Sequence, residues 1–112
     1  MSKILVIEDE AAIRRVLIKI LSEESDTYQV EEAEDGLKGL TAIKNTDYDL
    51  VLCDIKMPKM DGVEVLEKAK KIKPEIPMLM IWLLRPILVS LKICGLPTHR
   101  LKALNRFQKI FG

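Results

Sequence analysis

Two short apolar runs in this chain end abruptly in acidic residues. Residues 4–7 lead directly into Glu8 and Asp9, and residues 50–53 lead directly into Asp54. Uninterrupted apolar runs of this length are typical of strands that are buried on both faces of a parallel sheet. If the two strands are neighbours, their ends bring Glu8, Asp9 and Asp54 to one place at the edge of the sheet.

The chemistry of this place follows from the charges of the three side chains. Carboxylates held close together repel one another, so some of them take up protons unless a positive charge compensates them. A hard divalent cation such as Mg²⁺ is the usual compensation, and it also bridges phosphate oxygens. A cation held by Glu8, Asp9 and Asp54 would bring a phosphoryl group to Asp54, which can act as a nucleophile and become an acyl phosphate. Taken singly, Asp9 or Glu10 is explained by helix capping, and Asp54 is an ordinary loop acid.

Strand-like and helix-like segments alternate along the first part of the chain. Strands are predicted over residues 3–7, 28–33, 50–53 and 78–81, and helices over residues 10–22, 37–43 and 65–72. This alternation predicts an α/β fold with a doubly wound parallel sheet, in three αβα layers with right-handed crossovers. Sites in such sheets form beyond the carboxyl ends of the strands, where the strand order reverses. Both acidic strand ends fall there.

The first predicted helix shows which of its positions should be buried. Its apolar residues are spaced along one face: Ile13, Val16, Leu17, Ile20 and Leu21. Three basic residues, Arg14, Arg15 and Lys19, are therefore expected on the solvent side.

Other positions have simpler interpretations. The pairs Asp35-Gly36 and Asp61-Gly62 are interpreted as turns. Leu37 is interpreted as part of the second helix face, and Lys59 as a solvated charge.

The composition suits one soluble domain over residues 1–112. Of these residues 48% are hydrophobic and 31% are charged, and the net charge is only +1, which does not indicate binding to nucleic acid or to an anionic membrane. Neither a signal peptide nor a membrane span is expected, because no apolar stretch is long enough. The expected location is the cytoplasm. Cys53 and Cys94 do not form a CxxC pair, so a zinc site is not expected.

The acidic motifs together resemble the receiver domain of bacterial two-component response regulators, whose fold is flavodoxin-like. The motifs that carry the resemblance are residues 4–10, Asp35-Gly36 and residues 54–62. The resemblance covers residues 2–81, about 70% of the chain. It implies that Pro58 and Gly62 shape the loop that follows Asp54.

The resemblance also implies specific roles for the acids. Asp54 would be the phosphoacceptor, receiving a phosphoryl group from a histidine kinase or a phosphotransfer protein in a Mg²⁺-dependent reaction. Asp9 and Asp54 would bind Mg²⁺ together with the backbone carbonyl of Lys56. Glu8 occupies a position that is more often Asp and acts largely through water, so its longer side chain is tolerable there.

The sequence departs from the family after residue 81. Trp82 stands where the family places a Ser or Thr that bonds the phosphoryl group, and its side chain has no hydroxyl. The family's later Lys-Pro pair is also absent. Residues 1–81 carry all 17 acids and 12 bases, a net charge of −5, whereas residues 82–112 carry six bases and no acid, a net charge of +6. We expect no fifth strand in residues 82–112, and only a short amphipathic segment near residues 101–107.

Two interpretations of the basic tail, residues 82–112, remain open. It is either an evolved appendage that binds a partner, or an out-of-frame translation of the family's usual ending. Residues 101–104, Leu-Lys-Ala-Leu, can be encoded as CTC AAA GCC CTN, and reading one nucleotide further on gives Ser-Lys-Pro. The choice of codons is ours, so this comparison establishes compatibility with a frameshift. Together with the loss of acids at residue 82, it favours the second interpretation.

The missing ending has consequences for assembly and function. A sheet of four strands leaves the edge of the fourth strand open unless the tail covers it, which favours a homodimer or a swapped dimer. The leading prediction is a phosphoacceptor module, not a turnover enzyme, with impaired switching. One alternative is a pseudo-receiver that binds partners without being phosphorylated. A less favoured alternative is a Mg²⁺-dependent phosphatase with Asp54 as nucleophile, because Lys56 stands where such enzymes usually carry a second Asp.

Overall fold

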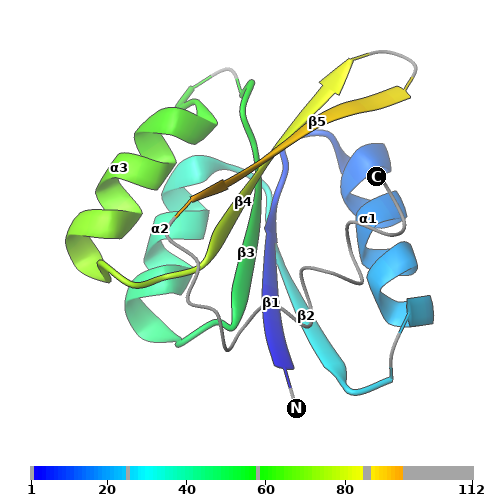
Figure 1. Ribbon diagram of the computed structural model, residues 1–112, viewed down its shortest axis with the longest axis horizontal. Helices are drawn as coiled ribbons and strands as arrows, with labels where there is room; N and C mark the ends of the chain where they lie inside the picture. The colour runs from blue at the N-terminus through cyan, green and yellow to red at the C-terminus, as the bar shows by residue number, and fades with distance from the viewer. Residues whose placement is uncertain (1, 25, 58, 85–86, 95–112) are drawn as a thin grey trace.

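The computed structural model describes residues 2–24, 26–57, 59–84 and 87–94, and from residue 82 onward it describes the backbone alone. In chain order, the elements are β1 (Ser2–Ile7), α1 (Ala11–Glu24), β2 (Tyr28–Ala33), α2 (Gly36–Asn45), β3 (Leu50–Asp54), α3 (Gly62–Ile72), β4 (Met78–Leu84) and β5 (Ile87–Cys94). Helices α2 and α3 lie side by side on one face of the sheet, and α1 covers the other (Figure 1). The predicted three-layer α/β fold is confirmed. None of the described helices is both long and apolar enough to cross a membrane.

The strand order places the ends of β1 and β3 at the switch point. The sheet runs β2-β1-β3-β4-β5, and β1 to β4 are parallel, as predicted. β2 lies at the edge, which fits its mixed polarity. The chain passes from β1 outward to β2 and then crosses back to β3 on the other side of β1. The strand order therefore reverses between β1 and β3, where this architecture forms its sites.

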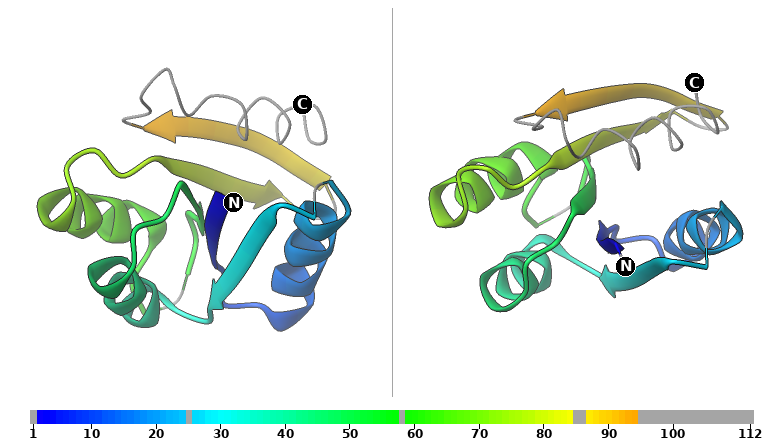
Figure 2. Two further views of the ribbon diagram at one scale, coloured as in Figure 1. Left: turned by 90° about the horizontal axis from the view of Figure 1, so that it is seen from below. Right: turned by 60° about the horizontal axis from the view of Figure 1, so that its bottom comes forward.

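A fifth strand is present that we did not expect from the sequence. β4 continues to Leu84 instead of ending at Ile81, and β5 pairs antiparallel with it (Figure 2). The prediction that residues 82–112 contain no strand is therefore wrong for Ile87–Cys94. The reason is the length of the connection. Only residues 85 and 86 separate the two strands, and so short a link permits a hairpin but not the crossover that parallel pairing requires.

β5 occupies the edge of β4 that was expected to stay open. The prediction of a homodimer or a swapped dimer rested on that open edge, so it loses this basis, and dimerisation itself stays a prediction. The other expectations for the tail concern the amphipathic segment and the reading-frame comparison. Both fall in residues 95–112, outside the residues that the structure describes.

Alternate residues of the central strands pack into two hydrophobic cores, one on each face of the sheet. The core on the α1 face comprises Ile4, Val6, Leu17, Leu21, Leu50, Leu52, Leu79 and Ile81. The core on the α2–α3 face includes Leu5, Ile7, Ile43, Val51, Cys53, Val65, Ala69 and Met80. Because both faces of β1 and β3 are buried, polar residues are excluded until each strand leaves the sheet. This burial explains why the two apolar runs end so abruptly in acids.

Three side chains differ from the exposure predicted for them. Val16 on α1 and Leu37 on α2 are 56% and 62% exposed, although both were assigned to apolar helix faces. Conversely, the side chain of Arg14 is only 13% exposed, although it was expected in solvent. α1 meets the sheet through a narrow stripe centred on Leu17 and Leu21, so Val16 lies beyond the contact. Arg14, in the first turn, reaches back to the end of β1.

Two acids that were interpreted as turn residues cap helices. Asp35 accepts a hydrogen bond from the backbone N–H of Lys38 (2.8 Å) and is the N-cap of α2. Asp61 accepts one from the backbone N–H of Glu64 (2.9 Å) and is the N-cap of α3. In each case the carboxylate satisfies a donor that the first helical turn leaves unpaired. The turn interpretation is therefore corrected at both positions.

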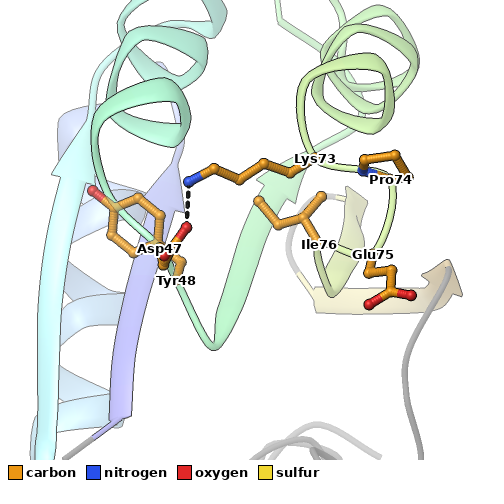
Figure 3. Close-up of a pocket in the computed structure, with 6 residues that line it drawn as sticks. All are labelled: Asp47, Tyr48, Lys73, Pro74, Glu75 and Ile76. Atoms are coloured by element: carbon orange, nitrogen blue, oxygen red, sulfur yellow. Dashed lines mark hydrogen bonds and ion pairs between the residues drawn. The ribbon is translucent and has the colours of Figure 1, made fainter.

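A pocket of about 540 Å³ (Figure 3) lies where β3 and β4 begin. The acids follow the ends of β1 and β3, at the opposite end of the sheet. The pocket is lined by residues that precede β3 and β4, where Lys73 Nζ lies 2.6 Å from Asp47 Oδ1. Lys73 also donates to the backbone carbonyl of Thr46 at 2.9 Å. These contacts join the loop after α2 to the end of α3. We assign the pocket to this loop junction and not to the acidic site.

Gly62 closes the loop that follows β3. Its N–H donates to the carbonyl of Ile55 at 2.8 Å, which folds the loop back onto the strand end. A Cβ atom at this position would lie 2.3 Å from the carbonyl oxygen of Asp54 and 2.8 Å from the Cα of Ile55. Both neighbours are backbone atoms, so neither can move aside cheaply. Only glycine fits here without displacing the segment that carries Asp54.

We predict that Gly62→Ala lowers the free energy of unfolding by about 1–3 kcal/mol, the usual effect of overpacking a tight site. Urea denaturation measures the change. Val63→Ala is the matched control, because Val63 is the next residue and is 49% exposed, and we expect little change from it. Equal stabilities for the two variants would contradict the role given to Gly62.

Candidate functional site

The three predicted carboxylates meet at the switch point. Glu8 and Asp9 follow β1, and Asp54 is the last residue of β3. One carboxylate oxygen from each of the three lies within 4.8 Å of the others. The pairing of β1 with β3 causes this meeting, because it sets Ile7 beside Cys53 and so aligns the two strand ends. The prediction that both apolar runs deliver acids to one place is confirmed.

Two of the three carboxylates are almost completely removed from solvent. Glu8 is 1% exposed and Asp54 is 9% exposed, while Asp9 is half-buried. Backbone N–H groups supply some compensation: that of Glu10 donates to Glu8 Oε1, and that of Lys56 donates to Asp54 Oδ1, each at 3.2 Å. Both bonds are at the long end of the range for N–H···O contacts. The site therefore holds buried negative charge with modest hydrogen-bond support.

Burial and mutual repulsion shift the protonation of the site. Burial, together with the negative charge of Asp54, raises the pKa of Glu8 to about 9. Burial also raises the pKa of Asp54, while its hydrogen bonds with the Glu8 side chain and the Lys56 backbone act in the opposite direction. At neutral pH and without a cation, Glu8 is protonated, and its carboxyl O–H donates a hydrogen bond to Asp54. The prediction that one of the clustered acids takes up a proton is thus supported.

A hard divalent cation fits this ligand set. The three side chains offer only oxygen atoms, which Mg²⁺ and Ca²⁺ prefer, and they are close enough together to share one ion. A bound cation would replace the proton on Glu8, since metal ligands bind in their deprotonated form.

The loop after β3 frames the other side of the site. Lys56 is exposed and its backbone N–H faces Asp54, whereas the role of its carbonyl as a metal ligand stays a prediction. Pro58, also assigned to this loop, lies outside the described residues. Met57 and Met60 are each 8% exposed and help to line a hollow of about 270 Å³, which Asp9 and Lys59 also line. Lys59 itself is exposed, as predicted.

Arg14 is a site residue that the sequence interpretation missed. Its Nη1 donates to the backbone carbonyl of Glu8 at 2.9 Å, and its Nε lies 3.0 Å from Glu32 Oε1 on β2. The available signal was its position in the first turn of α1, immediately after the acidic segment, where a long side chain can reach back to the strand end. The apolar periodicity placed it on the solvent side of the helix instead.

Position 82 lies within β4 and not beyond it. Trp82 is opposite Ser90 of β5, and the register shifts between Trp82 and Leu83. The absence of a hydroxyl at position 82 is a property of the sequence and stands unchanged.

Comparison with known proteins identifies the family. The model for the response regulator receiver domain matches residues 4–83, which include all three carboxylates and the loop to Gly62. The chain belongs to the response regulator receiver domain family. A curated relative, the transcriptional regulatory protein ResD of Bacillus subtilis, is 40% identical over 80 residues, which cover 71% of this chain and 32% of ResD.

Solved receiver domains share the fold. A CheY-like receiver domain protein of Methanospirillum hungatei is 32% identical, with a TM-score of 0.69 over 95% of this chain and 75% of that chain. The response regulator TrrA of Thermotoga maritima, in complex with Mg²⁺-BeF, is 34% identical, with a TM-score of 0.70 over 76% of this chain and 72% of that chain. TrrA in complex with the histidine kinase ThkA is 36% identical, with a TM-score of 0.65 over 71% of this chain and 67% of that chain.

Membership of the family establishes the general function. The chain is a receiver domain of two-component response regulators, a class that binds Mg²⁺ at acidic residues and works with histidine kinases. The chain spans only 22% to 32% of the length of curated relatives such as the protein-glutamate methylesterase/protein-glutamine glutaminase of Thiobacillus denitrificans and ResD. The activities of the relatives' remaining segments are therefore not assigned to this receiver domain.

The raised pKa of Glu8 predicts a pH-dependent stability. Unfolded Glu8 ionises near its ordinary pKa of 4.5, while folded Glu8 keeps its proton up to about pH 9. The folded state therefore binds more protons in this window, and stability falls as pH rises from about 4.5 to about 9. In the presence of a chelator, the Glu8→Gln variant should not lose stability over this pH range, because glutamine does not ionise. We expect its melting temperature at pH 8 to exceed that of the wild type by about 4 °C or more, the effect of roughly 1 kcal/mol.

Thermal unfolding of both proteins in EDTA from pH 5 to pH 9 measures the difference. The difference between the two proteins should be smallest at pH 5, close to the pKa of 4.5 of unfolded Glu8, and should grow as the pH rises. Glu10→Gln is the matched control, because Glu10 is exposed on the same segment, and its difference from the wild type should not grow with pH. Parallel curves for Glu8→Gln and the wild type would contradict the account.

Proposed function

We propose that Asp54 is the phosphoacceptor of this receiver domain and takes its phosphoryl group from a histidine kinase or a phosphotransfer protein. The observation that carries the proposal is the meeting of Asp54 with Glu8 and Asp9 at the switch point, inside the segment that matches the family. On this proposal the chain is a cytoplasmic phosphoacceptor module and not a turnover enzyme.

The acids would hold Mg²⁺. Glu8, Asp9 and Asp54 would contribute carboxylate oxygens, directly or through water, and Lys56 would contribute its backbone carbonyl. A bound Mg²⁺ neutralises negative charge on phosphate oxygens, which is a large part of phosphoryl-transfer catalysis. The buried position of Asp54 supports this role, because electrostatic stabilisation is stronger where water is excluded.

The transfer itself is a substitution at phosphorus. A carboxylate oxygen of Asp54 forms the new bond to phosphorus while the bond from phosphorus to the donor's leaving atom breaks, and the leaving group departs with the electron pair. The product is an acyl phosphate on Asp54. On this proposal a donor would approach the site through the hollow beside Asp9, which Met57 and Met60 also line. Lys59 on its rim adds a positive charge that suits an anionic donor.

We predict an acyl adduct of one phosphoryl group when the wild-type protein is incubated with Mg²⁺ and acetyl phosphate, detected by intact mass. Asp54→Asn should abolish it, because an amide oxygen is a far weaker nucleophile, and EDTA should abolish it in the wild type. Asp61→Asn is the matched control, because Asp61 lies in the same loop but caps α3, a role that Asn also fills. An adduct that persists in Asp54→Asn would overturn the assignment.

A second candidate function is a pseudo-receiver that binds partners without being phosphorylated. Trp82 favours it, because the resemblance places at this position a hydroxyl that bonds the phosphoryl group. Of the two candidates we favour the phosphoacceptor with impaired switching. We therefore expect phosphorylation to occur but to leave β4 and β5 unaltered. Amide hydrogen exchange of both strands, with and without acetyl phosphate, should therefore agree. Phosphorylation that slows or speeds exchange in β4 would contradict impaired switching, and failure to phosphorylate would favour the pseudo-receiver.

A further inference from the structure

Arg14 connects the end of β1 to β2 through its guanidinium group. Nη1 donates to the backbone carbonyl of Glu8 at 2.9 Å, and Nε pairs with Glu32 at 3.0 Å. The backbone N–H of Arg14 also donates to the carbonyl of Glu10 at 2.9 Å, in the first turn of α1. The side chain is 13% exposed, whereas its partner Glu32 is 55% exposed. The guanidinium is therefore held at the strand end and not in solvent.

The backbone of Glu8 is held from both sides. Its N–H donates to the carbonyl of Ala33 at 3.1 Å, and its carbonyl accepts from Arg14. Ala33 follows Glu32 directly on β2, so the contacts close a ring that passes from Glu8 to β2, through Arg14, and back to Glu8. Such a ring fixes the orientation of the peptide that connects Glu8 to Asp9.

We infer that Arg14 is a positioning residue for the cation site, and this inference rests on the proposed function. By fixing the Glu8 carbonyl, Arg14 sets the direction in which the carboxylates of Glu8 and Asp9 project toward Asp54. Residues that orient metal ligands in this way typically change metal affinity by 10–100-fold when they are replaced. Arg14 does not itself touch the cation or the reacting atoms.

The geometry requires the forked guanidinium and not merely a positive charge. Arg14 uses two separate nitrogens for two acceptors, one directly after β1 and one on β2, whereas lysine offers a single point charge. Glu32, by contrast, contributes an exposed ion pair, which is normally worth little. Replacing Arg14 should thus disturb the site far more than neutralising Glu32.

The test measures the dissociation constant of Mg²⁺ by isothermal titration calorimetry on the full chain, well below the melting temperature of each variant. We expect Arg14→Gln to weaken Mg²⁺ binding by about tenfold and Arg14→Lys to weaken it less. Glu32→Gln, which leaves the contact between Arg14 and the Glu8 carbonyl in place, should stay within about twofold of the wild type. The rate of adduct formation with acetyl phosphate should follow the same order.

The outcomes separate the inference from the proposed function. If the wild type binds Mg²⁺ and Arg14→Gln binds it equally well while melting at a lower temperature, Arg14 is merely structural and the inference is overturned. If Arg14→Gln does not fold, the comparison of Arg14→Lys with Glu32→Gln decides, and equal affinities overturn the inference. If the wild type binds no Mg²⁺ and forms no adduct, the proposed function fails and the inference fails with it.

Discussion

The repulsion among three carboxylates that the fold brings together is the constraint on which the rest of the structure depends. Glu8 and Asp54 are almost fully buried, so neither can relieve its charge by contact with water. A proton on Glu8, whose pKa rises to about 9, relieves this conflict, and on the proposed function a divalent cation would take its place. Stability and ligand binding are therefore two consequences of the same arrangement.

The surrounding framework maintains this unfavourable arrangement. Two apolar cores, one on each face of the sheet, fix β1 and β3 side by side and so align their acidic ends. Gly62 allows the loop after β3 to pack against the backbone of Asp54. Arg14 holds the end of β1 through the carbonyl of Glu8. The stabilisation of the cores offsets the electrostatic cost of the site, as is common where proteins keep functional strain.

Much of the fold and of the carboxylate site could be predicted from the sequence, because burial on both faces leaves a plain pattern. Residues 4–7 and 50–53 had to be central strands, and the acids after them had to lie at the sheet edge. Positions that depend on partners distant in sequence could not be predicted in this way. Arg14 is polar by type, and its burial depends on the Glu8 carbonyl. β5 was not predicted because residues 82–112 lack the motifs of the family's usual ending. A link of two residues between two apolar runs nevertheless favours a hairpin, and this signal was present in the sequence.

The central claim is that Glu8 carries a proton which a cation displaces. Isothermal titration calorimetry of Mg²⁺ binding at pH 7, in two buffers with different ionisation enthalpies, measures the protons released per ion bound. The account predicts the release of about one proton, because a cation at the site favours the ionised form of Glu8 whether Glu8 binds it directly or through water. Glu8→Gln should release none. Mg²⁺ binding by the wild type without proton release would contradict the claim.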